Sequence, residues 1–285
     1  MLGTRVVTAV VLLLALLALL ASNSVLAVAV AAGVFFAAAS WEAARLFQSR
    51  HAIAVAALWT ALFAVAVSRQ VYLTPRPLVT LMMVCVLIWA IRLAPSLKVG
   101  LPPLDGLGNK LLSGIYGVAI LGCFMAILAL FAHSPLYLFS VMAIIWIADI
   151  GAYFSGKAFG KRKLAPSISP GKSWEGAIGG WLAVLVLAGA STQVPALQDT
   201  FAAHVRTARG WPLLLLVLTL MAAASVIGDL FESMLKRRAG AKDSSALLPG
   251  HGGVLDRIDA LIPTLPLALL IGSLVQSVVQ SPIRP

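Results

Sequence analysis

The chain has 285 residues, of which 61% are hydrophobic and only 11% are charged, and its formal net charge is +11. A soluble domain usually has about a quarter charged residues, so this composition excludes a chain that faces water on all sides. A mean hydropathy of +1.00 indicates a protein solvated largely by lipid, in which an excess of Lys and Arg indicates cytoplasmic loops rather than a nucleic-acid surface.

Apolar runs long enough to cross a bilayer follow one another along the chain, since a spanning helix needs roughly 20 mostly apolar residues. They cover residues 5–21, 24–44, 52–68, 77–95, 111–132, 135–154, 174–191, 211–235 and 259–279. The first run could be a signal peptide, but no small-x-small cleavage site follows "ALLASNS", so we expect a retained span.

The fold class that these runs predict is an all-α, polytopic integral membrane protein with about nine transmembrane helices. We expect an N-terminal set of helices over residues 1–132 and a C-terminal catalytic region over residues 133–285, within one integrated membrane domain. The loops give an orientation, because Lys and Arg accumulate in cytoplasmic loops. The N-terminus and the loops after the second, fourth, sixth and eighth runs hold 16 of the Lys and Arg residues, and the segments on the opposite side hold 5. This bias predicts a cytoplasmic N-terminus and an outside C-terminus.

Acidic residues are rare, and eight of the ten fall between Asp149 and Asp259. In the predicted topology seven of these eight lie at the cytoplasmic side, and only Asp199 lies on the far side. Acids in or beside spans usually face a cavity, although a single acid can simply pair with a nearby cation. Because these seven come from four spans, we predict an active site at the cytoplasmic face.

The segment "SPGKSWEG", residues 169–176, ends a polar loop just before the seventh run. Its Gly-Lys-Ser could belong to a P-loop, but Pro166 stands where a P-loop needs a glycine. A lysine and a hydroxyl at a helix N-terminus still favour anions. We expect Lys172 and Ser173 to contact phosphate; the alternative is an ordinary helix start with Ser173 as its N-cap.

The segment "GDLFESMLKRRAGAKDSSALLPGHGGVLDRID", residues 228–259, is the most polar long stretch between two apolar runs. On a helix, Asp229, Ser233, Lys236 and Arg237 share one face, which carries a carboxylate, a hydroxyl and two cations. Such a face suits a phosphate and its counter-ion.

Two more carboxylates, Asp256 and Asp259, begin the last run. Mg²⁺ is typically held by one or two carboxylates plus substrate phosphates. Glycines in the preceding loop would let backbone N–H groups approach a polyphosphate. His251 could act as an acid or base, but a lone loop histidine is more often a hydrogen-bonding strut.

The same segment resembles the signature of the phosphatidate cytidylyltransferases, the CDP-diacylglycerol synthases. That signature reads Ser-x-apolar-Lys-Arg, then Lys-Asp, then Pro-x-His-Gly-Gly-apolar-x-Asp-Arg-x-Asp, and it agrees at every fixed position over the 27 residues from Ser233 to Asp259. "DIGAYFSGKAFGKRKL" and "SPGKSWEG" also look like family motifs. Ile150 and Gly171 depart from the expected pattern and could alter nucleotide contacts.

The resemblance implies transfer of the cytidylyl group of CTP to phosphatidate, giving CDP-diacylglycerol and pyrophosphate for phospholipid biosynthesis. It implies Mg²⁺ held by Asp229 and Asp256. The expected catalytic residues are Asp229, Asp256, Lys236 and Asp259. The expected substrate-binding residues are Asp149, Lys172, Ser173, Ser233, Arg237, Lys242, Asp243, His251, Gly252, Gly253 and Arg257.

The expected partners are CTP, phosphatidate and the lipid bilayer, without nucleic acid, and a homodimer stays open. The expected location is the bacterial cytoplasmic membrane. Two other functions remain alternatives: another lipid-phosphate cytidylyltransferase or CTP-dependent polyprenol kinase, and a transporter or channel. A transporter would place its acids nearer the bilayer midplane, whereas here they gather beside a basic, glycine-rich loop.

Overall fold

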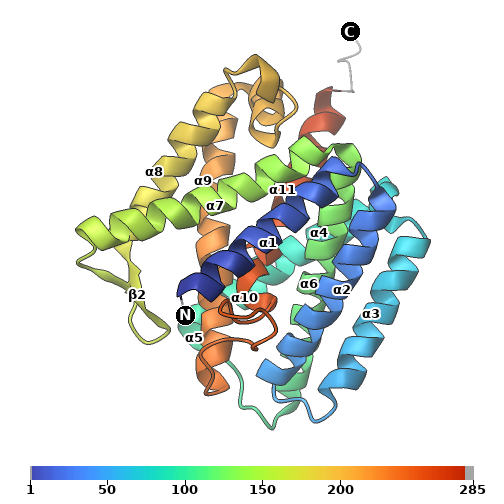
Figure 1. The fold of residues 1–285 in the computed structure, drawn as a ribbon, viewed down its shortest axis with the longest axis vertical. Coiled ribbons are helices and arrows are strands. Elements are labelled where there is room, and N and C mark those ends of the chain that lie inside the picture. The colour runs from blue at the N-terminus through green and yellow to red at the C-terminus, as the bar shows by residue number, and fades with distance from the viewer. Residues whose placement is uncertain (1, 280–285) are drawn as a thin grey trace.

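The computed structural model describes residues 2–279 (Figure 1). The end of the predicted catalytic region, residues 280–285, lies outside the described residues and includes Arg284 of the smaller basic set. The helices are α1 (Leu2–Ala21), α2 (Val25–Leu46), α3 (Ala52–Ser68), η1 (Val71–Leu73), α4 (Pro75–Ile88), η2 (Trp89–Leu93), α5 (Ala94–Val99), α6 (Leu107–His133), α7 (Pro135–Phe159), α8 (Trp174–Ser191), η3 (Pro195–Leu197), α9 (Phe201–Arg238), α10 (Leu255–Ile258) and α11 (Leu261–Val279).

The predicted apolar runs all fall in helices, and the all-α prediction is confirmed. By length and composition, seven segments of the described chain could cross a membrane: Val25–Leu46, Pro75–Val99, Leu107–His133, Pro135–Phe159, Trp174–Ser191, Phe201–Arg238 and Leu255–Val275. The other two runs correspond to the shorter apolar helices Val10–Ala21 and Ala52–Ser68. The chain is therefore a multi-pass membrane protein with seven candidate spans, and nine spans stays a prediction.

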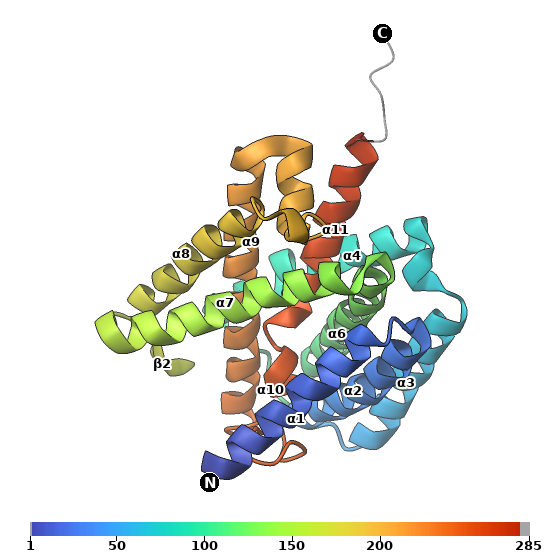
Figure 2. The ribbon, with the colours of Figure 1, turned by 45° about the horizontal axis from the view of Figure 1, so that its top comes forward.

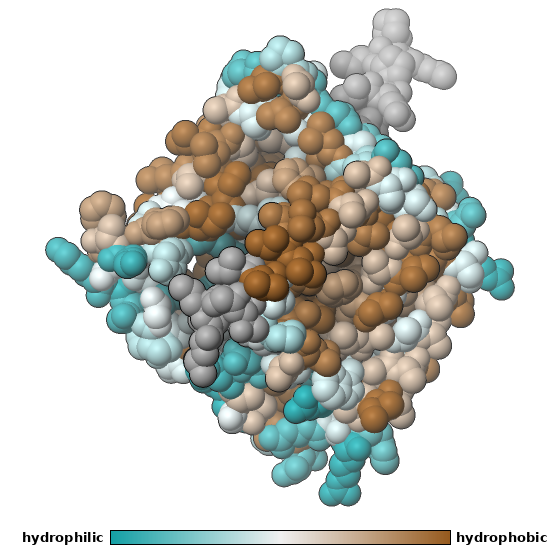
Figure 3. All heavy atoms as spheres, viewed as in Figure 1, coloured by the Kyte–Doolittle hydropathy of each residue, from teal (hydrophilic) through white to brown (hydrophobic). Residues whose placement is uncertain are grey.

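The outer surface supports a lipid environment. Large apolar side chains such as Leu26, Ile53 and Val186 are exposed rather than buried. Apolar residues cover the middle of the face in Figure 3, and polar residues gather along its lower and left margins. Hydrocarbon chains rather than water would cover such a middle band.

The core is centred on α6, which has 72% of its most apolar window buried. Phe36, Phe63 and Phe124 join α2, α3 and α6, with centroids 4.9 Å apart for the stacked Phe36–Phe63 pair. Helix α11 packs against α4, α6 and α9, so helices from both halves of the chain share this core. In both ribbon views α2 and α3 lie side by side, and α8 and α9 lie beside α7 (Figure 2).

Three breaks in the helices shape the region around the acids. A short antiparallel hairpin, β1 (Lys163–Ala165) and β2 (Ser169–Ser173), separates α7 from α8. Helix α9 is kinked at Gly210, which has φ +76 and precedes Pro212, so its membrane-spanning part starts where the sequence placed it. The third break, at residues 259–260, separates the short helix α10, which precedes the ninth run, from α11, which contains nearly all of that run.

Close helix packing positions the hairpin. A Cβ on Gly176 would lie 2.8 Å from the carbonyl oxygen of Ala152, so only glycine lets α8 approach α7 this closely. Ser173 caps α8, because its hydroxyl accepts a hydrogen bond from the Gly176 N–H. Ser173 is thus the N-cap of α8, and its expected contact with phosphate stays a prediction. Strand β2 leads directly into the N-terminus of α8.

Candidate active site

A polar cavity of about 530 Å³ lies between α7, the hairpin, α8, α9 and α10. These elements meet on one side of the helices, around the hairpin in Figure 1. Four carboxylates line the cavity: Asp149, Asp229, Asp256 and Asp259. Three cations line it as well: Lys157, Lys172 and Arg257. Segments separated by up to about a hundred residues therefore bring most of the predicted acids and several predicted cations to one site.

The hairpin brings a lysine to α9. Lys172 Nζ lies 2.5 Å from Asp229 Oδ2, and both side chains are about 30% exposed, at 28% and 30%. The Ser233 hydroxyl donates a weaker bond to the other oxygen, Oδ1, at 3.3 Å. Asp229 thus keeps one loosely bound oxygen and a positive neighbour that can move towards a phosphate.

Asp256 is held more tightly than Asp229. Its Oδ1 accepts from Lys236 at 2.6 Å, and its Oδ2 accepts from the Ser244 N–H, the Ser244 hydroxyl and the Gly253 N–H at 2.8, 2.9 and 2.8 Å. Lys236 also forms an ion pair with Glu232, whose side chain is fully buried. Lys236 therefore does not line the cavity, but its ammonium group orients the Asp256 carboxylate that does.

Glu42, which the sequence interpretation missed, anchors the glycine-rich loop from the far side. The Ser245 hydroxyl donates to its buried carboxylate at 2.5 Å, and the Ser244 hydroxyl, whose single proton is shared between Glu42 and Asp256, lies 3.1 Å from the other oxygen. Glu42 also accepts from the N–H groups of Val254 and Leu255 at 3.0 and 2.6 Å, at the start of α10. One acid of α2 thus fixes the loop that precedes Asp256, although more than 200 residues separate them.

The loop glycines have a structural reason that the sequence did not reveal. A Cβ on Gly253 would collide with Ser244 Oγ and the Glu42 carboxylate, and one on Gly252, at φ +82, would lie 2.6 Å from Asp256 Oδ2. The Gly253 N–H already donates to Asp256. The glycines therefore let the loop close on its own carboxylates, and the Gly253 N–H is not free to cradle a phosphate.

Arg257 and His251 hold the rest of this loop. The Arg257 guanidinium donates twice to the His251 carbonyl, at 3.0 and 2.5 Å. A guanidinium has five N–H donors, so three remain for a ligand in the cavity. His251 Nδ1 is buried and has no hydrogen-bond partner in the described part of the chain.

Several predicted site residues do not line the cavity. Arg237 donates from Nε to the carbonyl of Ile168 in the hairpin, at 3.3 Å. Glu175, one of the seven acids expected at the cytoplasmic side but not a predicted site residue, accepts from the N–H groups of Lys161 and Arg162, so it closes the base of the hairpin. The predicted residues outside the cavity wall are Ser233, Lys236, Arg237, Lys242, Asp243, His251, Gly252 and Gly253.

Lys157 and Tyr153 line the cavity but were not predicted as site residues. They follow Asp149 at intervals of four residues in α7, and this spacing places all three on one helix face. The four-residue spacing is present in the sequence, but nothing in the motif around Asp149 distinguishes Tyr153 and Lys157 from its glycines and its other lysines.

The chemistry of the cavity suits a hard divalent cation. Its acids offer only oxygen donors, which Mg²⁺ prefers, and one or two of them suffice when substrate phosphates supply the rest. Four carboxylates against three cations give the wall a formal negative charge, so a polyphosphate would enter with a neutralising ion. Asp229 Oδ1, with its single weak bond, is the least committed oxygen of the pair predicted to hold the metal.

An apolar pocket of about 320 Å³ adjoins the polar cavity. Leu164, Ala177, Trp181, Ala222 and Val226 line both. Among its described lining residues Thr219 carries the one hydroxyl, which accepts from the Trp181 ring N–H at 2.9 Å. A polar head group and an apolar tail could therefore occupy neighbouring spaces between α8 and α9.

Comparison with known proteins agrees with this chemistry. The sequence model described as "Cytidylyltransferase family" matches residues 3–275. A phosphatidate cytidylyltransferase of Haemophilus influenzae is 54% identical over 134 residues, which cover 47% of this chain and 44% of that protein. Another, of Bacillus subtilis, is 40% identical over 162 residues, 57% of this chain and 56% of that protein. The matched segment thus spans about half the length of these relatives.

Proposed function

The chain belongs to the cytidylyltransferase family, and from that premise we propose that it transfers the cytidylyl group of CTP to phosphatidate. The products are CDP-diacylglycerol and pyrophosphate. The observation that carries the proposal is the single cavity in which Asp149, Asp229, Asp256 and Asp259 face Lys172 and Arg257. The names of the relatives that match about half of this chain support the same reaction.

In the proposed reaction, a phosphate oxygen of phosphatidate attacks the α-phosphorus of CTP. The bond between the α-phosphorus and the bridging oxygen breaks, and pyrophosphate leaves with that oxygen. No protein nucleophile is required, because positioning and charge neutralisation supply most of the catalysis in such transfers. Asp229 and Asp256 would hold Mg²⁺, which when bound would supply positive charge to offset the charge that develops on the leaving group.

The side chains of the cavity have separate tasks in this proposal. Lys172 and Arg257 bind phosphates, and Lys172 exchanges its contact with Asp229 for one with the substrate. Asp229 and Asp256 hold the cation, with Asp256 oriented by Lys236 and by the loop that Glu42 anchors. Asp259, which accepts from the Ala260 N–H at 2.7 Å, adds a carboxylate behind them.

The adjoining apolar pocket supports a lipid as the second substrate. The head group would lie beside Lys172, and an acyl chain would follow the apolar surface of α8 and α9 towards the bilayer. A soluble phosphate ester would leave this pocket to water. The pocket therefore favours a lipid phosphate over a small metabolite, but it does not distinguish one lipid tail from another.

The cavity forms where α7 ends, α8 begins, α9 ends and α10 begins. These are the helix ends that the 16-to-5 division of basic residues assigns to the cytoplasm. We propose that the site opens to the cytoplasm at the inner leaflet of the bacterial cytoplasmic membrane, with the N-terminus inside. Cytosolic CTP and the phosphatidate head group would then meet at the same surface.

The experiment that tests the proposal uses the full chain in mixed micelles containing phosphatidate. With CTP and Mg²⁺ we expect a lipid product that carries cytidine, together with pyrophosphate. Chelation of divalent cations should abolish the product, and readdition of Mg²⁺ should restore it. Consumption of CTP without formation of CDP-lipid, or absence of any lipid product both with and without Mg²⁺, would contradict the proposal.

A further inference from the structure

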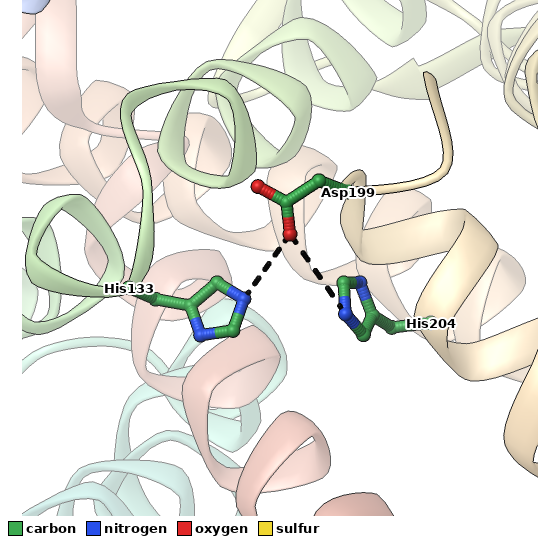
Figure 4. A group of neighbouring side chains, drawn as sticks. All are labelled: His133, Asp199 and His204. Atoms are coloured by element: carbon green, nitrogen blue, oxygen red, sulfur yellow. Dashed lines mark ion pairs between the residues drawn. The ribbon is translucent and has the colours of Figure 1, made fainter. Parts of the chain in front are cut away.

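Two histidines and an aspartate meet at the ends of α6 and α9 that lie away from the polar cavity. His133 is the last residue of α6, Asp199 precedes α9, and His204 lies in the first turn of α9. Figure 4 shows both rings turned towards one carboxylate oxygen. We refer to these three residues as the outer cluster, because the predicted topology places them outside the cytoplasm.

The spacing of the outer cluster fits one metal ion. His133 Nε2 lies 3.4 Å and His204 Nε2 lies 3.8 Å from Asp199 Oδ1. Two ligand atoms held about 2.1 Å from one tetrahedral zinc ion are about 3.4 Å apart. Within the described part of the chain, this is the one group of three His, Cys, Asp or Glu side chains whose ligand atoms all lie within 4.8 Å.

The surrounding hydrogen bonds turn the ligand atoms towards one another. His204 Nδ1 lies 3.0 Å from the Thr200 carbonyl, which can only accept, so Nδ1 carries the proton. In neutral His204 the lone pair is then on Nε2 and faces the Asp199 carboxylate. Metal-ligating histidines are commonly oriented in this way by a carbonyl on the other ring nitrogen.

Further contacts hold the other two ligands. The Ser134 hydroxyl donates to Asp199 Oδ2, which leaves Oδ1 directed at the histidines. The Tyr137 ring packs against both imidazoles, with centroids 4.4 Å from His133 and 5.3 Å from His204. The cluster is therefore organised before any ion binds.

A lone pair aimed at a carboxylate is unfavourable unless a positive charge lies between them. A divalent ion between them would supply that charge and would satisfy three ligand atoms at once. Arg206, the nearest arginine in the sequence, donates instead to Thr192, at 2.9 Å from its hydroxyl.

We propose that His133, Asp199 and His204 bind one transition-metal dication of the zinc class. Imidazole and carboxylate ligands suit Zn²⁺, whereas the carboxylates of the cavity suit Mg²⁺, so the two sites would take different ions. The ligand side chains are 36%, 47% and 33% exposed, so solvent completes the coordination. The ion would link the turn between α6 and α7 to the start of α9. It would thereby stabilise α7 and α9, which also contribute residues to the cavity.

The test uses the metal-free full chain in detergent, without an added histidine tag. Titration with Zn²⁺ by calorimetry should show one site per chain, and Co²⁺ should give the visible absorption of a site with nitrogen ligands. His133→Gln, Asp199→Asn and His204→Gln should each weaken Zn²⁺ binding by at least about 10-fold, the smallest loss usual even for an outer-shell partner. His51→Gln, a histidine at the start of α3, should bind as the wild type does.

Thermal unfolding gives a second readout. The midpoint should rise with Zn²⁺ in the wild type and in His51→Gln, and not in the three outer-cluster variants. Mg²⁺ should not replace Zn²⁺ in this effect, and Asp229→Asn should retain it. No stoichiometric Zn²⁺ binding, or binding that survives all three substitutions, would overturn the proposal.

Discussion

Replacing Glu42 tests whether one buried acid of α2 organises the active-site loop. Each of its carboxylate oxygens contacts one hydroxyl and accepts from one backbone N–H: Oε1 from Ser245 and Val254, and Oε2 from Leu255 and from Ser244, whose proton is shared with Asp256. Glu42→Gln turns one oxygen into an NH₂ group. The hydroxyl on that side can rotate and accept from it, but the backbone N–H cannot, so one buried donor loses its partner.

An unpaired buried donor costs about 1–3 kcal/mol, so Glu42→Gln should lower the free energy of unfolding by that amount. Glu42→Ala orphans both N–H groups and should cost about 2–6 kcal/mol. Ser245→Ala removes the hydroxyl bond to Glu42 and an exposed acceptor of the Leu247 N–H that water can replace. As the matched control it should therefore cost about 0.5–1.5 kcal/mol.

Thermal unfolding and CDP-lipid formation would both be measured on inserted, purified protein. Activity should fall in the same order as stability, because the Glu42 loop also supplies the N–H groups that hold Asp256. Wild-type activity and unfolding midpoint in Glu42→Ala would refute this reasoning. A larger effect of Ser245→Ala than of Glu42→Gln would also refute it.

The remaining predictions concern the cavity and its orientation. Asp229→Asn and Asp256→Asn should each abolish most CDP-lipid formation. The double variant should be little less active than either single variant, because the effects of two residues that hold one ion are not additive. Asp105→Asn, in the exposed loop before α6, is the control and should keep wild-type activity. Lys236→Ala should destabilise the fold by about 3–5 kcal/mol, since it leaves the acids it pairs with uncompensated. Arg257→Ala should lower kcat/KM by about 10- to 150-fold, the kinetic equivalent of one charge-assisted contact. Its loss of stability should be smaller than that of Lys236→Ala, because its two bonds to the His251 carbonyl are exposed. Reporter fusions should give cytoplasmic signals in the hairpin and none in the turn between α6 and α7; the reverse would refute the topology.

Much of the fold was predictable because the bilayer imposes a length on every apolar helix. The runs beginning at residues 135 and 174 match the starts of α7 and α8. The run beginning at residue 211 starts at the Gly210 kink, because an apolar window detects the membrane part of α9 and not its polar first turns. The hairpin was not predicted, since three- and five-residue strands leave no alternation long enough to read.

The cavity was predictable where its residues lie in dense motifs close to helix ends. Asp149, Lys172, Asp229, Asp256 and Asp259 were expected at one face and line one cavity. The role of Lys236 was less predictable, because a helical face shows which side chains share a direction but not which partner they meet. Lys236 meets Asp256 and Glu232.

The contacts that escaped prediction join residues far apart in the chain. Glu42 is an isolated acid in an otherwise apolar run, and nothing near it in the sequence points to a loop some 200 residues later. The outer cluster likewise takes His133 from one helix end and Asp199 and His204 from another. Only the packing of α6, α7 and α9 brings these side chains together.

The measurement that tests the central claim most directly is the fate of two labels in CTP. Purified protein would be incubated with phosphatidate, Mg²⁺ and CTP labelled either at the α-phosphate or at the γ-phosphate. Cytidylyl transfer predicts that α-label enters the lipid and that γ-label leaves as pyrophosphate. Label from the γ-phosphate in the lipid would instead identify a CTP-dependent lipid kinase, and absence of both labels from the lipid would contradict the proposed reaction.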